Sequence, residues 1–310
     1  MLDNSLPSGS YFCYAHPRMS ETKANAPRSG SGAHAGHGSS KASSLKRFFA
    51  LPVYDVLDCL ERLASTRRPG LLMFGMLAVG CLAWFVYVPI HELLHVAGCV
   101  LTGGDVYQLE IKPWYGGTLL ARFFPWVVSG SDYAGRLSGF DTKGSDLTYL
   151  ATDFSPFLLT VLFGVLLLKL CARRPHPILF PIAVVLALAP FYNIPGDYFE
   201  MGSILTTRGL TPIAGPRFAA PPAAENEEEA PAGIVGGDTD AAFRGLRSDD
   251  VFTLLTDFFT RPAALGINGF GLFAAGIGII LVSFGMAVLL AFATYAAGHF
   301  VARVILPQNR

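Results

Sequence analysis

The chain has 310 residues, of which 52% are hydrophobic and 15% charged, and its 23 basic and 23 acidic side chains give a formal net charge of zero. This composition indicates an integral membrane protein, and the lack of net positive charge argues against a nucleic-acid partner. The five cysteines are scattered and form no Cys-x-x-Cys pair, which argues against a disulfide framework and a cysteine zinc site.

The N-terminal part divides into a tail and a helix. Residues 1–45 are rich in Ser, Gly, Ala and Lys without an aliphatic pattern, and we predict that they are disordered. Residues 46–68 place apolar side chains at helical spacing and carry a pair of basic residues on each side of them. This pattern predicts an amphipathic interfacial helix on an anionic membrane surface.

Four apolar runs are long enough to span a hydrocarbon core about 30 Å thick. They cover residues 71–101, 149–171, 176–195 and 269–299. We therefore predict an all-α integral membrane protein with about four transmembrane helices. Residues 69–205, which include the first three runs, are predicted to form the membrane core.

The connection between the first two runs contains two strand-like segments. Residues 106–112 and 118–124 are separated by a Gly116-Gly117 pair, which supplies the freedom that a tight turn needs. We predict a small β-hairpin-like insertion. Residues 129–146 are rich in Gly and Ser and are predicted to be a loop.

The C-terminal part begins with a stretch that lacks a folding pattern. Residues 206–247 contain Pro, Ala, Gly and an acidic block, which predicts a disordered acidic linker. Residues 248–310 are predicted to form an interfacial helix, ended by Pro262, and then the last transmembrane helix.

The first apolar run contains the sequence His91-Glu92-Leu93-Leu94-His95. A charged group in hydrocarbon costs roughly 2.5–3.5 kcal/mol, so such residues are functional by default. Since residues four apart share a helix face, His91 and His95 can bind one ion, with Glu92 beside them to act on a metal-bound water. This HExxH pattern predicts one zinc ion and a catalytic Glu92. The alternative is a pair of core histidines that bond to their neighbours.

A catalytic zinc site has three protein ligands and an open position. Because His91 and His95 lie near the C-terminal end of the first span, the third ligand must come from a helix end on the same side of the membrane. The end of the third span meets this condition with Asp197 and Glu200, and the start of the second span meets it with Asp153. We favour Asp197 and keep the other two carboxylates as competitors.

The third span ends in the sequence Asn193-Ile-Pro195-Gly196-Asp197. Together with the HExxH motif, this sequence resembles the site-2 protease family of intramembrane zinc metalloproteases, in which an aspartate of a later helix joins the two histidines. The resemblance covers about residues 71–205. In this chain glycine precedes the aspartate instead of following it, and the residues after Asp197 are too polar to begin the long membrane helix that the family has there.

Asn193 has two possible roles. Its amide can hold the substrate backbone or stabilise an oxyanion, or it can cap the helix that it ends. We carry it as a candidate substrate-binding residue.

The resemblance implies an intramembrane zinc metalloprotease that hydrolyses transmembrane or membrane-associated protein substrates. Glu92 takes the proton of the attacking water, and the segment 106–124 pairs with the unwound substrate as an added strand. The alternative is a non-proteolytic, metal-binding membrane scaffold or regulator. The distribution of basic residues beside the spans predicts a multi-pass protein with both termini in the cytoplasm.

Overall fold

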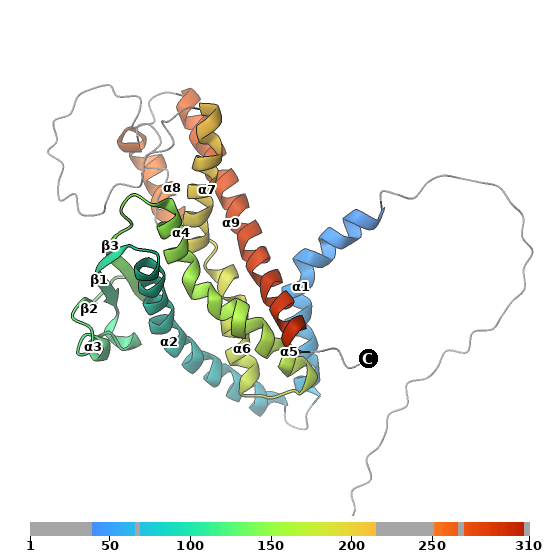
Figure 1. The fold of residues 1–310 in the computed structure, drawn as a ribbon. Helices are drawn as coiled ribbons and strands as arrows, with labels where there is room; N and C mark the ends of the chain where they lie inside the picture. Colours follow the sequence, from blue (N-terminus) through green and yellow to red (C-terminus); the bar gives the residue numbers. More distant parts are fainter. Residues whose placement is uncertain (1–38, 66–68, 215–250, 266–269, 307–310) are drawn as a thin grey trace, which may run out of the picture.

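The computed structural model describes residues 39–65, 69–214, 251–265 and 270–306. Long tilted helices form a bundle, and a small sheet lies beside α2 on one flank of it (Figure 1). The helices of the bundle are α1 (Ser39–Ala64), α2 (Pro69–Leu101), α4 (Asp146–Phe154), α5 (Val165–Arg173), α6 (Leu179–Tyr192), α7 (Asp197–Ala214), α8 (Val251–Thr260) and α9 (Phe270–Ile305). Short 3₁₀ and π turns connect α4 to α5, at Ser155–Phe157 and Thr160–Gly164.

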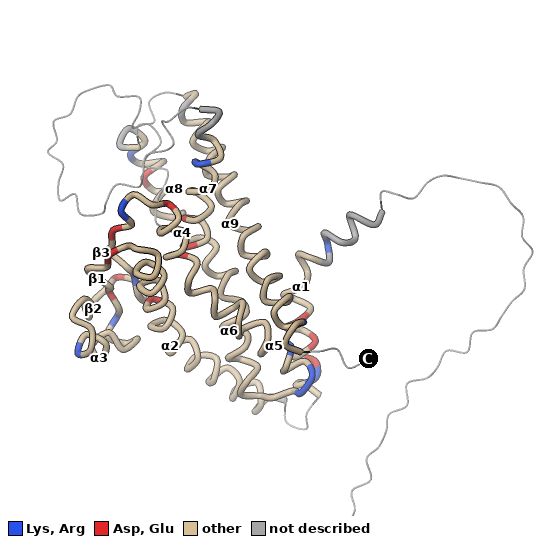
Figure 2. Tube along the Cα trace, in the orientation of Figure 1, with Lys and Arg blue, Asp and Glu red and all other residues tan. Residues whose placement is uncertain are grey.

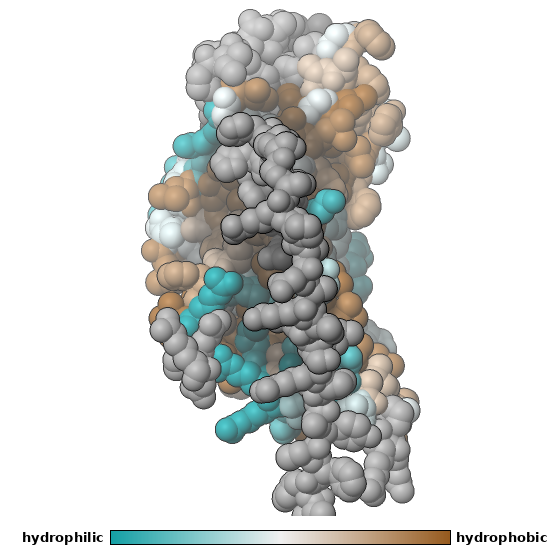
Figure 3. Space-filling model, turned by 90° about the vertical axis from the view of Figure 1, so that its right-hand side faces the viewer, coloured by the Kyte–Doolittle hydropathy of each residue, from teal (hydrophilic) through white to brown (hydrophobic). Residues whose placement is uncertain are grey.

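Four helical stretches are long and apolar enough to cross a membrane, which confirms the predicted number of apolar helices. They are Gly70–Leu101, Asp146–Arg173, Leu179–Leu210 and Phe273–Ile305. Charged side chains gather at the two ends of the bundle and around the sheet, and most of α6 and α9 lacks them (Figure 2). The face of the bundle in Figure 3 is brown over its upper part, with teal polar groups gathered lower down. The four helical stretches could therefore cross a membrane by their length and composition.

The third span is longer than predicted. Helix α7 begins at Asp197 and runs to Ala214, so the prediction that these residues are too polar for a long helix is wrong. Two of their buried hydroxyls are bonded within the helix itself, since Ser203 donates to the Glu200 carbonyl and Thr207 to the Ser203 carbonyl, each at 2.8 Å. This pairing lets polar residues be buried against α9. The predicted linker therefore begins after the helix, and residues 215–250 lie outside the described part of the chain.

Helix α1 starts inside the segment predicted to be a disordered tail, at Ser39; residues 1–38 lie outside the described part. The helix packs against α5 and α9. Its buried face includes Asp55 and Cys59, and Val53 points outward. The helix is thus docked on the bundle through a face that contains a carboxylate, and its place on a membrane surface stays a prediction.

A three-stranded sheet, not a hairpin, connects α2 to α4. Its order is β2 (Val127–Ser129), β1 (Asp105–Ile111), β3 (Gly135–Asp141). Strand β1 confirms the first predicted strand, but the second, over 118–124, is wrong. After Gly116, whose φ of 86° is left-handed, the chain forms the short helix α3 (Gly117–Leu120). That helix lies in the crossover that brings β2 parallel to β1.

Strand β3 lies in the stretch that was predicted to be a loop, so that prediction is also wrong. It pairs antiparallel with β1, with Leu137 opposite Leu109. The glycines that suggested a loop permit close packing instead. A Cβ atom on Gly139 would lie 2.9 Å from the Cβ atom of Gln108. Strand β3 also contacts α2, which brings it beside the HExxH motif.

Helix α8 matches the prediction for the segment after the linker. It covers Val251–Thr260, ends shortly before Pro262, and buries Leu254 and Phe258 in the core. Its first N–H group, on Val251, donates to the Pro195 carbonyl at 2.9 Å. This bond places α8 beside the break between α6 and α7.

Candidate metal centre

Helix α2 presents the two histidines of the HExxH motif on one buried face. Their Nε2 atoms lie 3.1 Å apart. The other nitrogen of each ring is held by a neighbour: His91 Nδ1 lies 2.8 Å from the Tyr87 hydroxyl, and His95 Nδ1 lies 2.9 Å from the Thr152 carbonyl. A carbonyl only accepts, so His95 Nδ1 carries the proton and its Nε2 lone pair is available. Hydrogen bonds of this kind, made by the ring nitrogen that does not bind the ion, orient metal-ligating histidines.

Helix α4 supplies the Thr152 carbonyl because it packs very closely on α2. A Cβ atom on Gly98 would lie 2.6 Å from the Ala151 carbonyl oxygen. The Ser155 hydroxyl donates to the Leu94 carbonyl at 2.5 Å. The glycine in α2 thus permits the approach that fixes the second histidine.

Asp197 joins the two histidines from the first turn of α7. Its Oδ2 atom lies 3.2 Å from His91 Nε2 and 3.8 Å from His95 Nε2. This oxygen is buried and has no hydrogen-bond partner among the described residues. A group of one carboxylate oxygen and two imidazole nitrogens, all within 4.8 Å of one another, can hold a metal ion.

The spacing of these atoms fits a tetrahedral ion. With zinc–nitrogen bonds of about 2.0–2.1 Å, two ligands of a tetrahedral site lie about 3.3 Å apart. The separations of 3.1, 3.2 and 3.8 Å bracket this value. A buried carboxylate oxygen that accepts no hydrogen bond is costly, and a cation between the three atoms would relieve that cost.

The break between α6 and α7 places Asp197 at this point. Helix α6 ends at Tyr192, and the Asn193 carbonyl accepts from the N–H groups of Gly196 and Tyr198, each at 3.2 Å. The Asn193 amide donates to the Ala189 carbonyl at 3.0 Å. This contact is the one expected if Asn193 caps the helix that it ends. Asn193 does not line the pocket that opens beside the three ligand atoms. A role for Asn193 in substrate binding stays a prediction.

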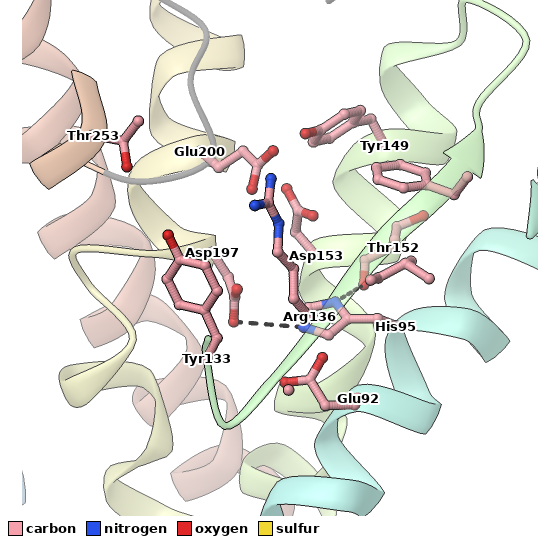
Figure 4. A pocket seen from close by; sticks show the side chains of 13 residues that line it. Glu92, His95, Tyr133, Arg136, Tyr149, Thr152, Asp153, Asp197, Glu200 and Thr253 are labelled. Atoms are coloured by element: carbon pink, nitrogen blue, oxygen red, sulfur yellow. Dashed lines mark hydrogen bonds and ion pairs between the residues drawn. The ribbon is translucent and has the colours of Figure 1, made fainter. Parts of the chain in front are cut away.

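A pocket of about 270 Å³ opens beside the three ligand atoms. Glu92, His95 and Asp197 line one part of it, and the competing carboxylates Asp153 and Glu200 line another. Neither competitor belongs to the group of close ligand atoms found among the described residues. In Figure 4 the Arg136 side chain of β3 extends across the pocket toward these two competitors.

Strand β3 presses directly on Glu92, a contact that the sequence did not predict. A Cβ atom on Gly135 would lie 2.4 Å from the Glu92 Cγ atom and 2.8 Å from its Cδ atom. The glycine therefore sets how near the sheet comes to the carboxylate. Its position in a stretch read as a loop concealed this role.

We expect Gly135→Ala to lower the rate of a reaction that uses Glu92 about a hundredfold, because the added methyl group must displace either Glu92 or β3, and a misplacement of 1 Å costs about that much. Zinc affinity should stay unchanged, since no ligand is touched. Gly75→Ala is the matched control, because a Cβ atom at that position of α2 would meet no neighbouring atom within 4 Å. Equal activity of both variants would show that the contact has no catalytic importance.

In comparisons with protein-family models, curated proteins and solved structures, nothing matches this chain. The geometry of the site and the motifs therefore carry the functional argument. The sequence predicted His91, Glu92, His95 and Asp197 as site residues. The structure brings ligand atoms of His91, His95 and Asp197 close together, and Glu92, His95 and Asp197 line the pocket beside them. It leaves Asn193 outside that pocket.

Proposed function

We propose that this chain is an intramembrane zinc metalloprotease that cleaves transmembrane or membrane-associated proteins. One observation carries the proposal: a carboxylate from α7 meets the two imidazoles of α2 at a buried point, with Glu92 beside them. Both helices belong to stretches that are apolar enough to cross a membrane. Ionisable groups gathered inside such stretches mark functional sites.

The donor set suits zinc in a catalytic role. Two histidines and one carboxylate leave a fourth position open, whereas structural zinc sites are closed by four protein ligands. His91, His95 and Asp197 would hold the ion, which when bound lowers the pKa of water and polarises a carbonyl group. The resemblance to the site-2 protease family supports the same donor set.

Glu92 lies where a general base is needed. Its side chain lines the pocket together with His95 and Asp197, and the contact with Gly135 restricts its position. In the proposed reaction Glu92 takes the proton of the attacking water and passes it to the leaving amine. The surrounding burial limits the access of other water, which strengthens electrostatic interactions in the site.

Strand β3 offers a binding surface for an extended substrate. It is an edge strand of the described sheet, and Gly135, Arg136 and Leu137 line the pocket. A substrate that has unwound can add to such an edge through main-chain hydrogen bonds. This strand replaces the segment 106–124 as the proposed pairing site, because most of the second half of that segment is helical or turn.

Removal of the metal tests the proposal. Protein purified in detergent should contain about one zinc ion per chain, as expected for a three-ligand site. A chelator should abolish cleavage of a membrane-anchored reporter protein, and added zinc should restore it. Bound zinc without cleavage of any reporter would favour the metal-binding scaffold, and a chain without stoichiometric metal would contradict both functions.

A further inference from the structure

The third ligand is held in place by a residue next to it in the sequence. Tyr198 is fully buried, and its hydroxyl donates to Thr294 Oγ1 of α9 at 2.8 Å. The Thr294 hydroxyl donates in turn to the Leu290 carbonyl at 2.9 Å. The ring of Tyr198 packs on Phe157, with centroids 4.4 Å apart, and Phe157 packs on His91 at 5.6 Å. Tyr198 thus ties the first turn of α7 both to α9 and to the histidine helix.

The next residue of α9 takes part in a second buried cluster. Tyr295 donates to Asp55 Oδ2 of α1 at 2.8 Å, and His299 Nε2 lies 2.5 Å from the same oxygen. Lys169 of α5 donates to the other oxygen, Oδ1, at 2.5 Å. We call Asp55, Lys169, Tyr295 and His299 the α1 clasp.

The clasp holds a charge away from water. Burial would raise the pKa of Asp55, but the hydrogen bonds from His299 and Lys169 hold it below its usual value. A buried carboxylate that loses such partners is strongly destabilised. The proposed catalysis uses none of the four residues. Their hydrogen bonds instead attach α1 to α5 and α9.

The two contacts meet on one turn of α9. Thr294 is bonded to Tyr198 of α7, and Tyr295 is bonded to Asp55 of α1. Helix α9 packs along α7 and contacts α1 and α5 as well. A shift or rotation of α9 that loosens the clasp must therefore move the hydroxyl to which Tyr198 is bonded.

We propose that α9 couples the docking of α1 to the position of Asp197, so that Tyr198 and Thr294 are positioning residues for the third ligand and α1 is a regulatory element of the metal site. This inference rests on metal binding by the proposed site. It does not depend on proteolysis. Release of α1 is expected to loosen the ligand geometry and to lower metal affinity, which would switch the site off without a change in its ligands.

Binding of Co²⁺ to the full chain tests the coupling, because the visible spectrum of this probe metal reports ligand geometry as well as occupancy. We expect Tyr198→Phe to lower Co²⁺ affinity about tenfold, in the range found for groups that orient metal ligands, and to alter the spectrum. Asp55→Asn and Tyr295→Phe should act in the same direction. Asp58→Asn is the matched control, since Asp58 lies on α1 but is exposed and paired with Arg62.

The route of the coupling is tested by combining variants. If the clasp acts through Tyr198, Tyr295→Phe should lower Co²⁺ affinity in the wild-type background and add little in the Tyr198→Phe background. Tyr295→Phe loses only a hydroxyl group, so it remains informative if Asp55→Asn does not fold. Wild-type affinity and spectrum in folded Tyr295→Phe, or additive losses in the double variant, would overturn the inference. A wild-type chain that binds no Co²⁺ would instead refute the proposed metal site.

Discussion

Glu92→Gln is expected to abolish peptide cleavage while the chain keeps its zinc. The substitution retains the size of the side chain that packs on Gly135 but removes the group that accepts a proton. General acid–base catalysis contributes about 10²–10⁴-fold, so we expect a loss of at least about a hundredfold in kcat. Cleavage of a membrane-anchored reporter by purified protein, measured beside zinc content, checks both parts.

The matched control for this variant is Glu61→Gln, the same chemical change on an exposed position of α1. It should cleave the reporter at the wild-type rate. Undiminished cleavage by Glu92→Gln would remove Glu92 from the mechanism and leave the pocket without its general base. Loss of zinc together with activity would assign the residue to the metal site instead.

The parts of the fold that follow from short-range patterns could be predicted from the sequence. The four apolar helices are read from run length, and His91 and His95 share a face because they are four residues apart on a helix. The end of α8 before Pro262 follows from the missing N–H group of proline. Each of these features depends on neighbours within a few residues.

The sheet could not be predicted in the same way, because its pairing depends on distant residues. The pairing of Leu109 with Val127 is parallel and needs a crossover, and no local signal identifies that partner. Gly135 and Gly139 suggested a loop, yet they serve close contacts with Glu92 and Gln108. A glycine that avoids a clash cannot be told from a flexible one until its neighbour is known.

The third ligand lies between these two cases. The number of membrane crossings limited it to Asp197, Asp153 or Glu200, but crossing number contains no distances. Among the described residues the structure brings Asp197, and neither competitor, into the group of close ligand atoms, because the α6–α7 break turns the chain beside the histidines. The residues after Asp197 looked too polar to begin a long membrane helix, because composition alone does not show that hydroxyl groups such as those of Ser203 and Thr207 are bonded within α7.

Asp197→Asn is expected to lower zinc affinity by more than about a hundredfold, since even the loss of a group that only orients a ligand costs about 10–100-fold. The amide keeps the shape of the side chain but loses the charge of an oxygen that lies 3.2 Å from His91 Nε2. Competition with a chromophoric zinc chelator measures the affinity. Zinc at a hundred times its Kd should also stabilise the folded wild-type chain by about 2.7 kcal/mol. This stabilisation raises the Tm of the wild-type chain, and the rise should be absent in the variant.

Asp153→Asn provides the decisive comparison, because Asp153 is a buried carboxylate that lines the same pocket as Asp197. It does not belong to the group of close ligand atoms in the described residues, so zinc affinity and the rise in Tm should stay near their wild-type values. The opposite pattern, with zinc lost in Asp153→Asn and kept in Asp197→Asn, would move the third ligand to α4. The α6–α7 break would then have no part in metal binding, and the coupling through Tyr198 would have no ligand to act on.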